Sequence, residues 1–349
     1  MNTFIGPISP SLAQCSSLQV FRAGSNDLYT LTKLQEISLH NNQLSGAINK
    51  AIVNLSNLII LELHANQLSG EIPQNIGLLS KLEQLQLQLH SNNLNGTFPP
   101  SLTKCTNLTT LFLRNNFFNG EISTLNFPKL QHLQALDLSN NTFSGNIPNT
   151  LCLSKSLRAI RLSYNQLISE VPPCMASLNS LTQISLSYNH LSNVVGALNT
   201  LKHCQNLGVL FLTRCFYDER IPNIDSDNLH TFKNLQILTL AGCKLKGQIP
   251  TWISKLKKLK VLNLSFNKLS GPIPAWGGQF ETFGIGAFEG NTKLCGEVIH
   301  RSCGAVVINR PKPEEEIDGG SKSLWYYMQF PLGLGYFVGL VGGTVGNRL

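Results

Sequence analysis

The feature that most constrains this chain is a phrase of spaced leucines that recurs about every 24 residues. It is clearest as "LIILELHANQLSGEIP" at residues 58–73, which has the pattern L-x-x-L-x-L-x-x-N-x-L-x-G-x-I-P. Twelve copies align on the Asn of this pattern, and nine of the eleven gaps between them are 24 to 26 residues long. The aligned positions are Asn2, Asn26, Asn42, Asn66, Asn92, Asn116, Asn141, Asn165, Asn189, Cys215, Cys243 and Asn267. A chain that repeats itself in register so often folds as a stack of similar coils.

The residues of the phrase predict how one coil is built. A period of about 24 residues with Asn or Cys at the aligned position is typical of the leucine-rich repeat. In L-x-L the side chains alternate, so the leucines point inward and the residues between them face solvent. The Asn is expected to bond the backbone of neighbouring coils, the Gly to allow a tight bend, and the Pro to keep its segment out of a regular ladder. We therefore predict an α/β repeat: a leucine-rich-repeat solenoid with parallel strands on its concave face and a mostly irregular or 3-10 convex side.

One coil is unusually short. Only 16 residues separate Asn26 from Asn42, because the stretch between them omits the usual G-x-I-P half. We interpret it as a lesion or a splice junction and expect the stack to be destabilised there.

Two longer segments carry a resemblance to a known family. "NLQILTLAGCKLKGQIPTWISKLKKLKVLNLSFNKLSGPIP" (residues 234–274) and "FEGNTKLCGEVIHRSC" (residues 288–303) resemble plant leucine-rich-repeat receptors, and most of all the tyrosine-sulfated peptide receptors of the phytosulfokine type. The resemblance covers roughly residues 1–304. It implies a C-terminal cap in which Phe280, Phe283 and Phe288 cover the last coil. It also implies that Cys295 and Cys303 form a disulfide, as in secreted modules.

The chain also departs from that family. Its first residues have the repeat pattern and no signal-peptide pattern, and residues 274–276 run directly into the cap, so we expect neither the island domain nor a kinase domain. We therefore expect a shortened receptor-like protein. The predicted parts are a solenoid of about twelve copies (1–274), a cap with a Cys pair (275–304), a juxtamembrane linker (305–323), a transmembrane helix (324–346) and a cytoplasmic stub (347–349).

The segment "LWYYMQFPLGLGYFVGLVGGTVG" (residues 324–346) carries no charge and is long enough to cross a bilayer. Residues 325–327 would form an aromatic belt at the interface. Gly335, Gly339 and Gly343 form overlapping G-x-x-x-G motifs, which allow a partner helix to approach closely. This predicts a single-pass plasma-membrane protein with extracellular repeats; the alternative is a Gly-rich disordered tail.

The nine cysteines fall into groups. Cys15, Cys105 and Cys204 each lie eleven residues before an aligned position, which predicts one recurring buried site on the convex side. Cys215 and Cys243 occupy the aligned position itself. Only the pair in the cap is expected to be bridged, and no cysteine is expected to bind metal or to act in catalysis.

Five N-x-S/T sequons occur in the chain, and an extracellular location makes them candidate glycosylation sites. They are Asn54, Asn95, Asn107, Asn140 and Asn263.

Ligand contacts are expected from the concave face. Residues two and four positions before each aligned position should point to solvent, and adjacent strands lie about 4.8 Å apart, so these side chains form rows that an extended peptide can follow. The candidates for ligand binding are His40, Glu62, His64, His90, Phe112, Arg114, Asp137, Arg161 and Phe211.

Three consecutive coils carry a histidine two positions before the aligned Asn: His40, His64 and His90. Protonated and beside Arg114, they would bind a sulfate or a carboxylate. A zinc site lacks an evident fourth ligand, and a solvated row without a ligand is the plain alternative. Phe112 and Phe211 occupy a position of the repeat that is expected to face solvent. They are candidate anchors for a ligand, unless they pack against a neighbouring side chain.

The formal net charge of +8 raises the question of nucleic acid. The one basic cluster, "KLKKLK" at residues 255–260, belongs to a convex segment and has no interleaved aromatic residues, so no nucleic-acid binding is expected. No nucleophile–base set, metal-spaced cluster or cofactor motif is apparent.

These observations favour a membrane-anchored, non-catalytic receptor-like protein that binds a peptide or protein and signals through a partner receptor kinase. The resemblance implies a tyrosine-sulfated peptide as ligand. The alternatives are a secreted decoy or inhibitor and a fragment of a receptor kinase.

Overall fold

The computed structural model describes residues 20–21, 33–79, 81, 86–223, 232–274 and 280–304. One compact unit spans Met1–Cys303 and a second spans Gly304–Leu349. Among the described residues, no helix is long and apolar enough to cross a membrane. The predicted linker and transmembrane helix lie outside the described residues.

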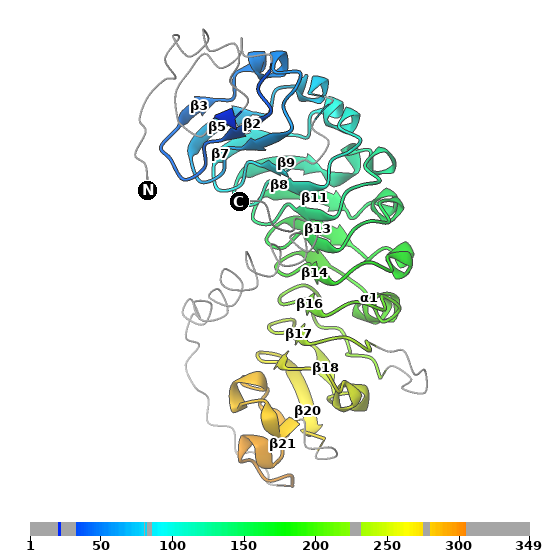
Figure 1. Cartoon of the computed structure of the whole chain (residues 1–349). Coiled ribbons are helices and arrows are strands. Elements are labelled where there is room, and N and C mark those ends of the chain that lie inside the picture. Colours follow the sequence, from blue (N-terminus) through cyan, green and yellow to red (C-terminus); the bar gives the residue numbers. More distant parts are fainter. Residues whose placement is uncertain are drawn as a thin grey trace, which may run out of the picture. The chain divides into compact units, whose positions relative to one another are not determined.

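The main sheet holds one strand from each coil whose strand the structure describes. Its described strands are all parallel and pair in the order β1-β2-β4-β6-β8-β10-β12-β14-β16-β17-β19. They are β1 (Val20–Phe21), β2 (Glu36–Ser38), β4 (Ile60–Glu62), β6 (Gln86–Gln88), β8 (Thr110–Phe112), β10 (Ala135–Asp137), β12 (Ala159–Arg161), β14 (Gln183–Ser185), β16 (Val209–Phe211), β17 (Ile237–Thr239) and β19 (Val261–Asn263). The leucines of L-x-L point into the stack, where Leu61, Leu111 and Leu136 are buried. Figure 1 shows these strands following one another along the inner side of the coils, which confirms the predicted parallel solenoid.

A second parallel sheet is formed by the L-x-G segments. Its strands are β3 (Ser45–Ala47), β5 (Gln67–Glu71), β7 (Asn93–Gly96), β9 (Phe117–Glu121), β11 (Thr142–Asn146), β13 (Gln166–Ser169) and β15 (His190–Leu191). The expectation that Pro keeps this half out of a ladder is wrong, because Pro lacks an N–H only at its own position and the residues before it still pair. Ser144, for example, pairs with both Glu121 and Gln166. The tight bend expected at Gly is confirmed, since Gly120 adopts a φ of +80°.

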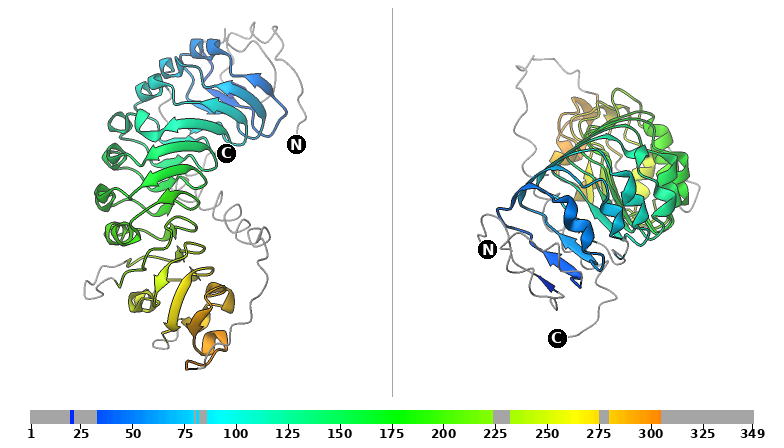
Figure 2. Two further views of the ribbon diagram at one scale, coloured as in Figure 1. Left: turned by 180° about the vertical axis from the view of Figure 1, so that it is seen from behind. Right: turned by 90° about the horizontal axis from the view of Figure 1, so that it is seen from above.

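Short 3-10 helices form much of the convex side, as predicted. Figure 2 shows them on the side of the coils opposite the main sheet. They are η3 (Lys50–Asn54), η4 (Ile76–Leu78), η5 (Pro100–Lys104), η6 (Ile122–Thr124), η7 (Phe127–Lys129), η8 (Asn149–Leu153), η9 (Pro173–Ser177) and η10 (Thr251–Lys255). The terminal segment adds η11 (Phe280–Thr282), η12 (Ile285–Ala287) and η13 (Glu297–Ile299).

The coil after Asn189 differs because its sequence has no G-x-I-P half. The second sheet ends there, and an α-helix, α1 (Val194–Leu201), takes the place of a 3-10 helix. Asn193 caps this helix by accepting a hydrogen bond from the Gly196 N–H at 2.8 Å. The Glu219 carboxylate accepts from the backbone N–H groups of Asn193 and Val194 at 2.8 and 2.7 Å, which places a negative charge at the positive end of the helix.

After this interruption, a three-stranded sheet continues on the last coils. It consists of β18 (Lys246–Gly247), β20 (Lys268–Pro272) and β21 (Lys293–Cys295).

The aligned Asn residues bond successive coils together, as the sequence predicted. The Asn141 amide donates to the carbonyls of Leu113 and Leu138 at 3.1 and 3.0 Å, and its oxygen accepts from the Phe118 N–H at 3.0 Å. At the Cys position, the Cys215 thiol donates to the Leu186 carbonyl but supplies no such oxygen acceptor. The ladder also extends one position beyond the twelve found in the sequence.

That further position is Asn291, inside the predicted cap. Its amide donates to the Leu264 carbonyl at 2.9 Å and its oxygen accepts from the Leu269 N–H at 3.0 Å. Phe280, Phe283 and Phe288 are buried beside it, as the resemblance implied. The last coil is therefore closed by a segment that keeps the ladder geometry.

Two disulfides are present among the described cysteines. One joins Cys295 to Cys303 in the cap. The other joins Cys152 to Cys174, whose Cα atoms lie 5.9 Å apart on the neighbouring helices η8 and η9. The expectation of a single bridge was wrong. Cys152 and Cys174 lie thirteen and fifteen residues before their aligned positions, so they occupy different positions of the repeat and the repeat pattern did not pair them.

The recurring buried cysteine site is confirmed for Cys105 and Cys204, which are both buried and unbridged. Burial raises the pKa of each thiol to about 11. In another coil the same phase holds Ser154, whose hydroxyl donates to the Phe127 carbonyl at 3.1 Å. Cys15 lies outside the described residues.

The short coil between Asn26 and Asn42 is reflected in the pairing of strands β1 and β2. Val20 of β1 pairs with Glu36 of β2, a step of 16 residues. Residues 22–32 lie outside the described residues, so the destabilisation expected there stays a prediction.

Candidate functional site

The concave face is built from two side-chain positions in every coil. Each described strand of the main sheet from β2 to β19 ends on the residue four positions before the aligned one. The strand register places Glu62 opposite Gln88, Phe112 opposite Gln88, and Phe211 opposite Ser185. The predicted rows of side chains therefore exist.

Three histidine rings form a stack two positions before the aligned Asn. The ring centroids of His40 and His64 lie 4.6 Å apart with an interplanar angle of 2°, and those of His64 and His90 lie 4.4 Å apart at 13°. His90 meets Phe112 edge-on at 6.5 Å. His40 is exposed, whereas His64, His90 and Phe112 are half-buried. The stack covers the ring faces of His64 and leaves ring edges to the concave side.

The electrostatics of this stack contradict the expectation of three protonated rings. Burial first, then repulsion from the neighbouring histidine and from Arg114, lowers the pKa of His64 to about 4 and that of His90 to about 3. The Nδ1 atoms of His64 and His90 are buried without a hydrogen-bond partner, and a protonated imidazole needs a partner at both nitrogens. Both rings are therefore neutral in mildly acidic solution, so they add no positive charge beside Arg114.

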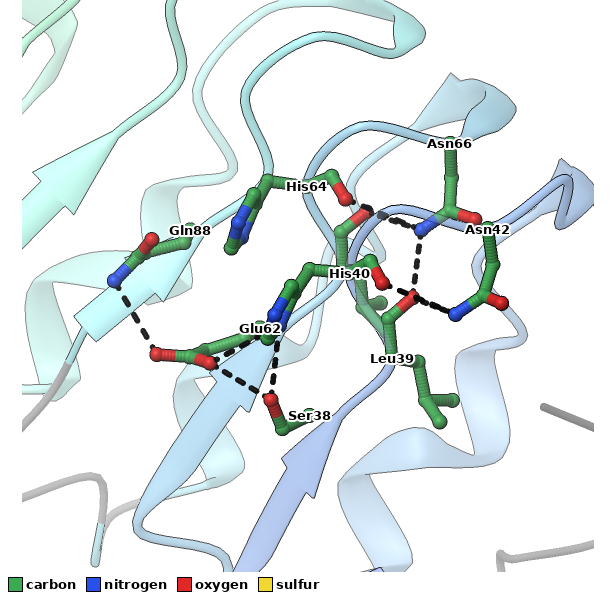
Figure 3. Close-up of polar contacts among 9 residues, drawn as sticks. Ser38, Leu39, His40, Asn42, Glu62, His64, Asn66 and Gln88 are labelled. Atoms are coloured by element: carbon green, nitrogen blue, oxygen red, sulfur yellow. Dashed lines mark hydrogen bonds and ion pairs between the residues drawn. The ribbon is translucent and has the colours of Figure 1, made fainter. Parts of the chain in front are cut away.

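Glu62 lies at the centre of a polar network beside the stack, drawn in Figure 3. Its carboxylate accepts from the Ser38 hydroxyl at 2.8 Å and from the Gln88 amide at 3.3 Å. The Nδ1 atom of His40 lies 3.5 Å from the same carboxylate, an ion pair when that ring is protonated. The network links three coils beside the histidine stack.

Asp137 and Arg161 hold a different arrangement. An Arg161 nitrogen lies 3.7 Å from the Asp137 carboxylate, and a second donates to the Gln183 amide oxygen at 3.1 Å. The side chains of Asp137 and Arg161 are only 6% and 13% exposed. Burial lowers the pKa of Arg161 and the nearby carboxylate raises it. The expectation that these two charges face a ligand is wrong, because each faces the other.

Phe211 is likewise not exposed: only 9% of its surface is accessible. Hydroxyl groups of the same coils bond one another: the Ser163 and Ser185 hydroxyls share a hydrogen bond at 2.5 Å, and the Thr213 hydroxyl donates to that of Thr239 at 3.0 Å. The expected exposed anchor at Phe211 is therefore wrong, and the alternative, a ring packed within the protein, is confirmed.

The concave face thus has two parts. We define the open half as His40, Glu62, His64, His90, Phe112 and Arg114. We define the closed half as Asp137, Arg161, Ser185, Phe211 and Thr239. The open half offers ring edges, one carboxylate and one guanidinium. In the closed half, Asp137 and Arg161 pair with each other, the hydroxyls of Ser185 and Thr239 bond hydroxyls of neighbouring coils, and Phe211 is buried.

A second aromatic row, which was not predicted from the sequence, lies one position before the aligned residue. The rings of Tyr164 and Tyr188 stack with centroids 4.0 Å apart, and the Arg214 guanidinium lies 5.5 Å from the centre of the Tyr188 ring. All three residues have a positive φ, between 49° and 56°. The repeated tripeptide "SYN" at 163–165 and 187–189 was the available signal.

The sequons occupy different environments. Asn54, Asn95 and Asn140 are exposed, and Asn107 and Asn263 are half-buried. Asn263 ends β19 and its side-chain oxygen accepts from the Ser265 hydroxyl at 2.7 Å, so a glycan there would stand on the concave face. Within the part of the chain that the structure describes, no group of three or more His, Cys, Asp or Glu side chains is placed to hold a metal ion.

Comparison with protein families identifies the repeat. Residues 106–167 match one leucine-rich-repeat family, and residues 33–55, 234–256 and 258–280 match another. Receptor-like protein 3 of Arabidopsis thaliana is 45% identical over 138 residues, which are 39% of this chain and 18% of that protein. Phytosulfokine receptor 1 of the same plant is 44% identical over 64 residues, 18% of this chain and 6% of that protein. The matched segments thus cover less than a fifth of either relative.

Solved structures share the same fold. A TDR receptor superimposes with a TM-score of 0.70 at 26% identity, over 78% of this chain and 48% of that chain. The complex PEPR1–AtPEP1 superimposes with a TM-score of 0.58 at 27% identity, over 81% of this chain and 46% of that chain. The chain therefore resembles the repeat ectodomains of plant receptors.

Proposed function

We propose that this leucine-rich-repeat protein is a non-catalytic, membrane-anchored receptor-like protein that binds a peptide along the open half of its concave face. The observation that carries the proposal is the half-exposed row of stacked rings that ends at Phe112 and Arg114. Elsewhere in the described concave columns, Asp137, Arg161 and Phe211 are engaged within the protein.

The chemistry of the open half favours a peptide with an aromatic, anionic side chain. Neutral imidazole edges and the Phe112 ring provide contacts for an aromatic ring. The Arg114 guanidinium can pair bidentately with a sulfate or a carboxylate, which a lysine at this position could not do. A tyrosine-sulfated peptide satisfies both requirements, and similarity to phytosulfokine receptor 1 supports that class.

The C-terminal sequence supports the anchoring and signalling that we propose. Residues 324–346 are uncharged and long enough to span a bilayer, which would place the repeats outside the plasma membrane. The G-x-x-x-G motifs at Gly335, Gly339 and Gly343 would receive the helix of a partner receptor kinase. Signalling would require this partner kinase, because we propose no catalytic activity for this chain itself.

The test is a binding titration of the full chain in detergent micelles with a phytosulfokine-type peptide in its sulfated and unsulfated forms. Arg114→Gln should weaken binding of the sulfated form about tenfold or more, because a charge-assisted bidentate pair contributes about 1.5–3 kcal/mol. Arg158→Gln is the matched control, since Arg158 is an exposed arginine away from the open half.

Phe112→Leu should weaken both forms of the peptide, because the ring contact does not depend on sulfate. Its control is Phe117→Leu, whose ring is 59% exposed on β9 of the second sheet. Absence of peptide binding, or equal losses in the site and control variants, would remove the proposal.

A further inference from the structure

A strongly basic pocket lies on the three-stranded sheet of the last coils. It has a volume of about 940 Å³ and is lined by β18, β20 and β21 together with the segment 220–223. Four of its lining residues are cations: Arg220, Lys246, Lys268 and Lys293. No acidic side chain and no aromatic ring is among the described residues that line it.

Strand pairing brings these cations together. Lys246 pairs with Lys268 in the parallel ladder, so their backbones are one strand spacing apart, about 4.8 Å. Lys293 pairs with Ser270, two residues further along the neighbouring strand. Like charges on adjacent strands repel, which costs stability unless a counter-charge is present.

The described structure supplies one nearby carboxylate. Asp218 lies 2.5 Å from the Lys268 ammonium and 3.6 Å from that of Lys246. The hydrogen bond from Lys268 lowers the pKa of Asp218, so the carboxylate stays ionised. Both lysine side chains remain about half exposed, at 53% and 49%. Among the described residues, the four lining cations outnumber this one paired carboxylate, so positive charge is in excess.

We propose that this pocket binds an anionic polysaccharide, a chain of uronic acid residues. Lysine ammonium groups are compact point charges, and a row of them suits carboxylates that repeat along a polymer. Gln248, Thr251 and Thr292 line the same pocket and offer amide and hydroxyl partners for sugar hydroxyl groups.

The lining also discriminates against the ligand of the concave face. A sulfated tyrosine would find no aromatic ring here among the described lining residues, whereas the open half has a row of them. The inference goes beyond the proposed function, because the pocket lies on other strands and shares no residue with the open half.

The experiment is a calorimetric titration of the full chain with a linear oligogalacturonate. The triple variant Lys246→Gln/Lys268→Gln/Lys293→Gln should weaken binding about tenfold or more, since three close charges are removed. The control is Lys257→Gln/Lys258→Gln/Lys260→Gln, which removes the same charge from exposed positions outside the pocket. The control should change affinity less than about twofold, because more distant exposed charges are screened by salt.

A third variant should change the affinity for oligogalacturonate in the opposite direction. Asp218→Asn removes the counter-charge and should tighten oligogalacturonate binding about twofold or more. Asn tolerates the positive φ of 61° at this position, so the backbone is preserved. Weaker binding by this variant would contradict the proposal.

The remaining outcomes also decide the question. Equal losses in the two triple variants would mean that the net charge of the chain attracts the polymer and would overturn the pocket. The proposal would also be overturned if the triple pocket variant lost affinity for a sulfated peptide and kept its affinity for oligogalacturonate. Because the peptide and the polymer are titrated separately, failure here leaves the test of the concave face unaffected.

Discussion

The open and closed halves occupy the same positions of the repeat and yet present different surfaces. Glu62 and Asp137 both end a strand of the main sheet. Glu62 accepts from half-exposed polar neighbours, whereas Asp137 is buried against a guanidinium on the next strand. The phase of the repeat thus decides which way a side chain points, and the residue one coil away decides whether it stays accessible.

The largest difference between the halves should appear when each carboxylate is removed. Asp137→Ala leaves the buried Arg161 charge without its carboxylate and should lower the free energy of unfolding by about 3–5 kcal/mol. Glu62→Ala should cost less than about 1 kcal/mol, because Ser38 and Gln88 can turn to water. Urea unfolding of both variants measures the difference. Similar losses would mean that the two halves are equally packed and would remove the distinction.

The convex side behind the closed half should be the next most sensitive. The double change Cys152→Ser/Cys174→Ser removes the bridge between η8 and η9 and should destabilise the solenoid by about 2–4 kcal/mol. Cys105→Ser is the control, since Ser154 fills the same phase in another coil and bonds a carbonyl there. A thermal melt that shows equal shifts for the two proteins would contradict a stabilising bridge.

A smaller effect, restricted to the open half, should appear with pH. His64 and His90 are neutral when folded, with pKa values of about 4 and 3, and in the unfolded chain each takes up a proton near pH 6.5. Between those values the unfolded state binds more protons, so the free energy of unfolding should fall as the pH is lowered from 6.5 towards 4. We expect about 1 kcal/mol for each ring, less than the full pKa difference, because the ring edges reach solvent.

Unfolding curves of His64→Gln and His90→Gln between pH 7 and 4 check this expectation. Each variant should have a shallower pH dependence than the parent chain, and the exposed His132→Gln should not. If all four proteins lose stability in parallel, carboxylates elsewhere account for the slope.

The sequence predicted the parts of the fold that depend on phase. The period placed Glu62 and Phe112 in one row, and it placed Cys105 in a buried site, because every coil repeats the same backbone path. Burial of Phe211 and the contact between Asp137 and Arg161 could not be predicted in this way. They depend on which side chains meet across neighbouring strands, and the position within one repeat does not determine that.

Backbone conformation accounts for the other failures. The left-handed residues Tyr164 and Tyr188 turn their rings out of the strand alternation, so an alternating pattern did not include them. The second sheet was missed because one Pro was taken to exclude a whole segment. Asn291 was missed because its coil has lost the leucine phrase while keeping the amide.

The central claim is that a ligand lies on the open half, and histidine footprinting tests it most directly. The full chain is treated with a carbethoxylating reagent with and without the sulfated phytosulfokine-type peptide, and modified histidines are identified by mass spectrometry. Protection should appear at His40, His64 and His90 and should be absent at the exposed His132 and His203. Protection of none of the three, or equal protection of all five, would contradict a ligand on the open half.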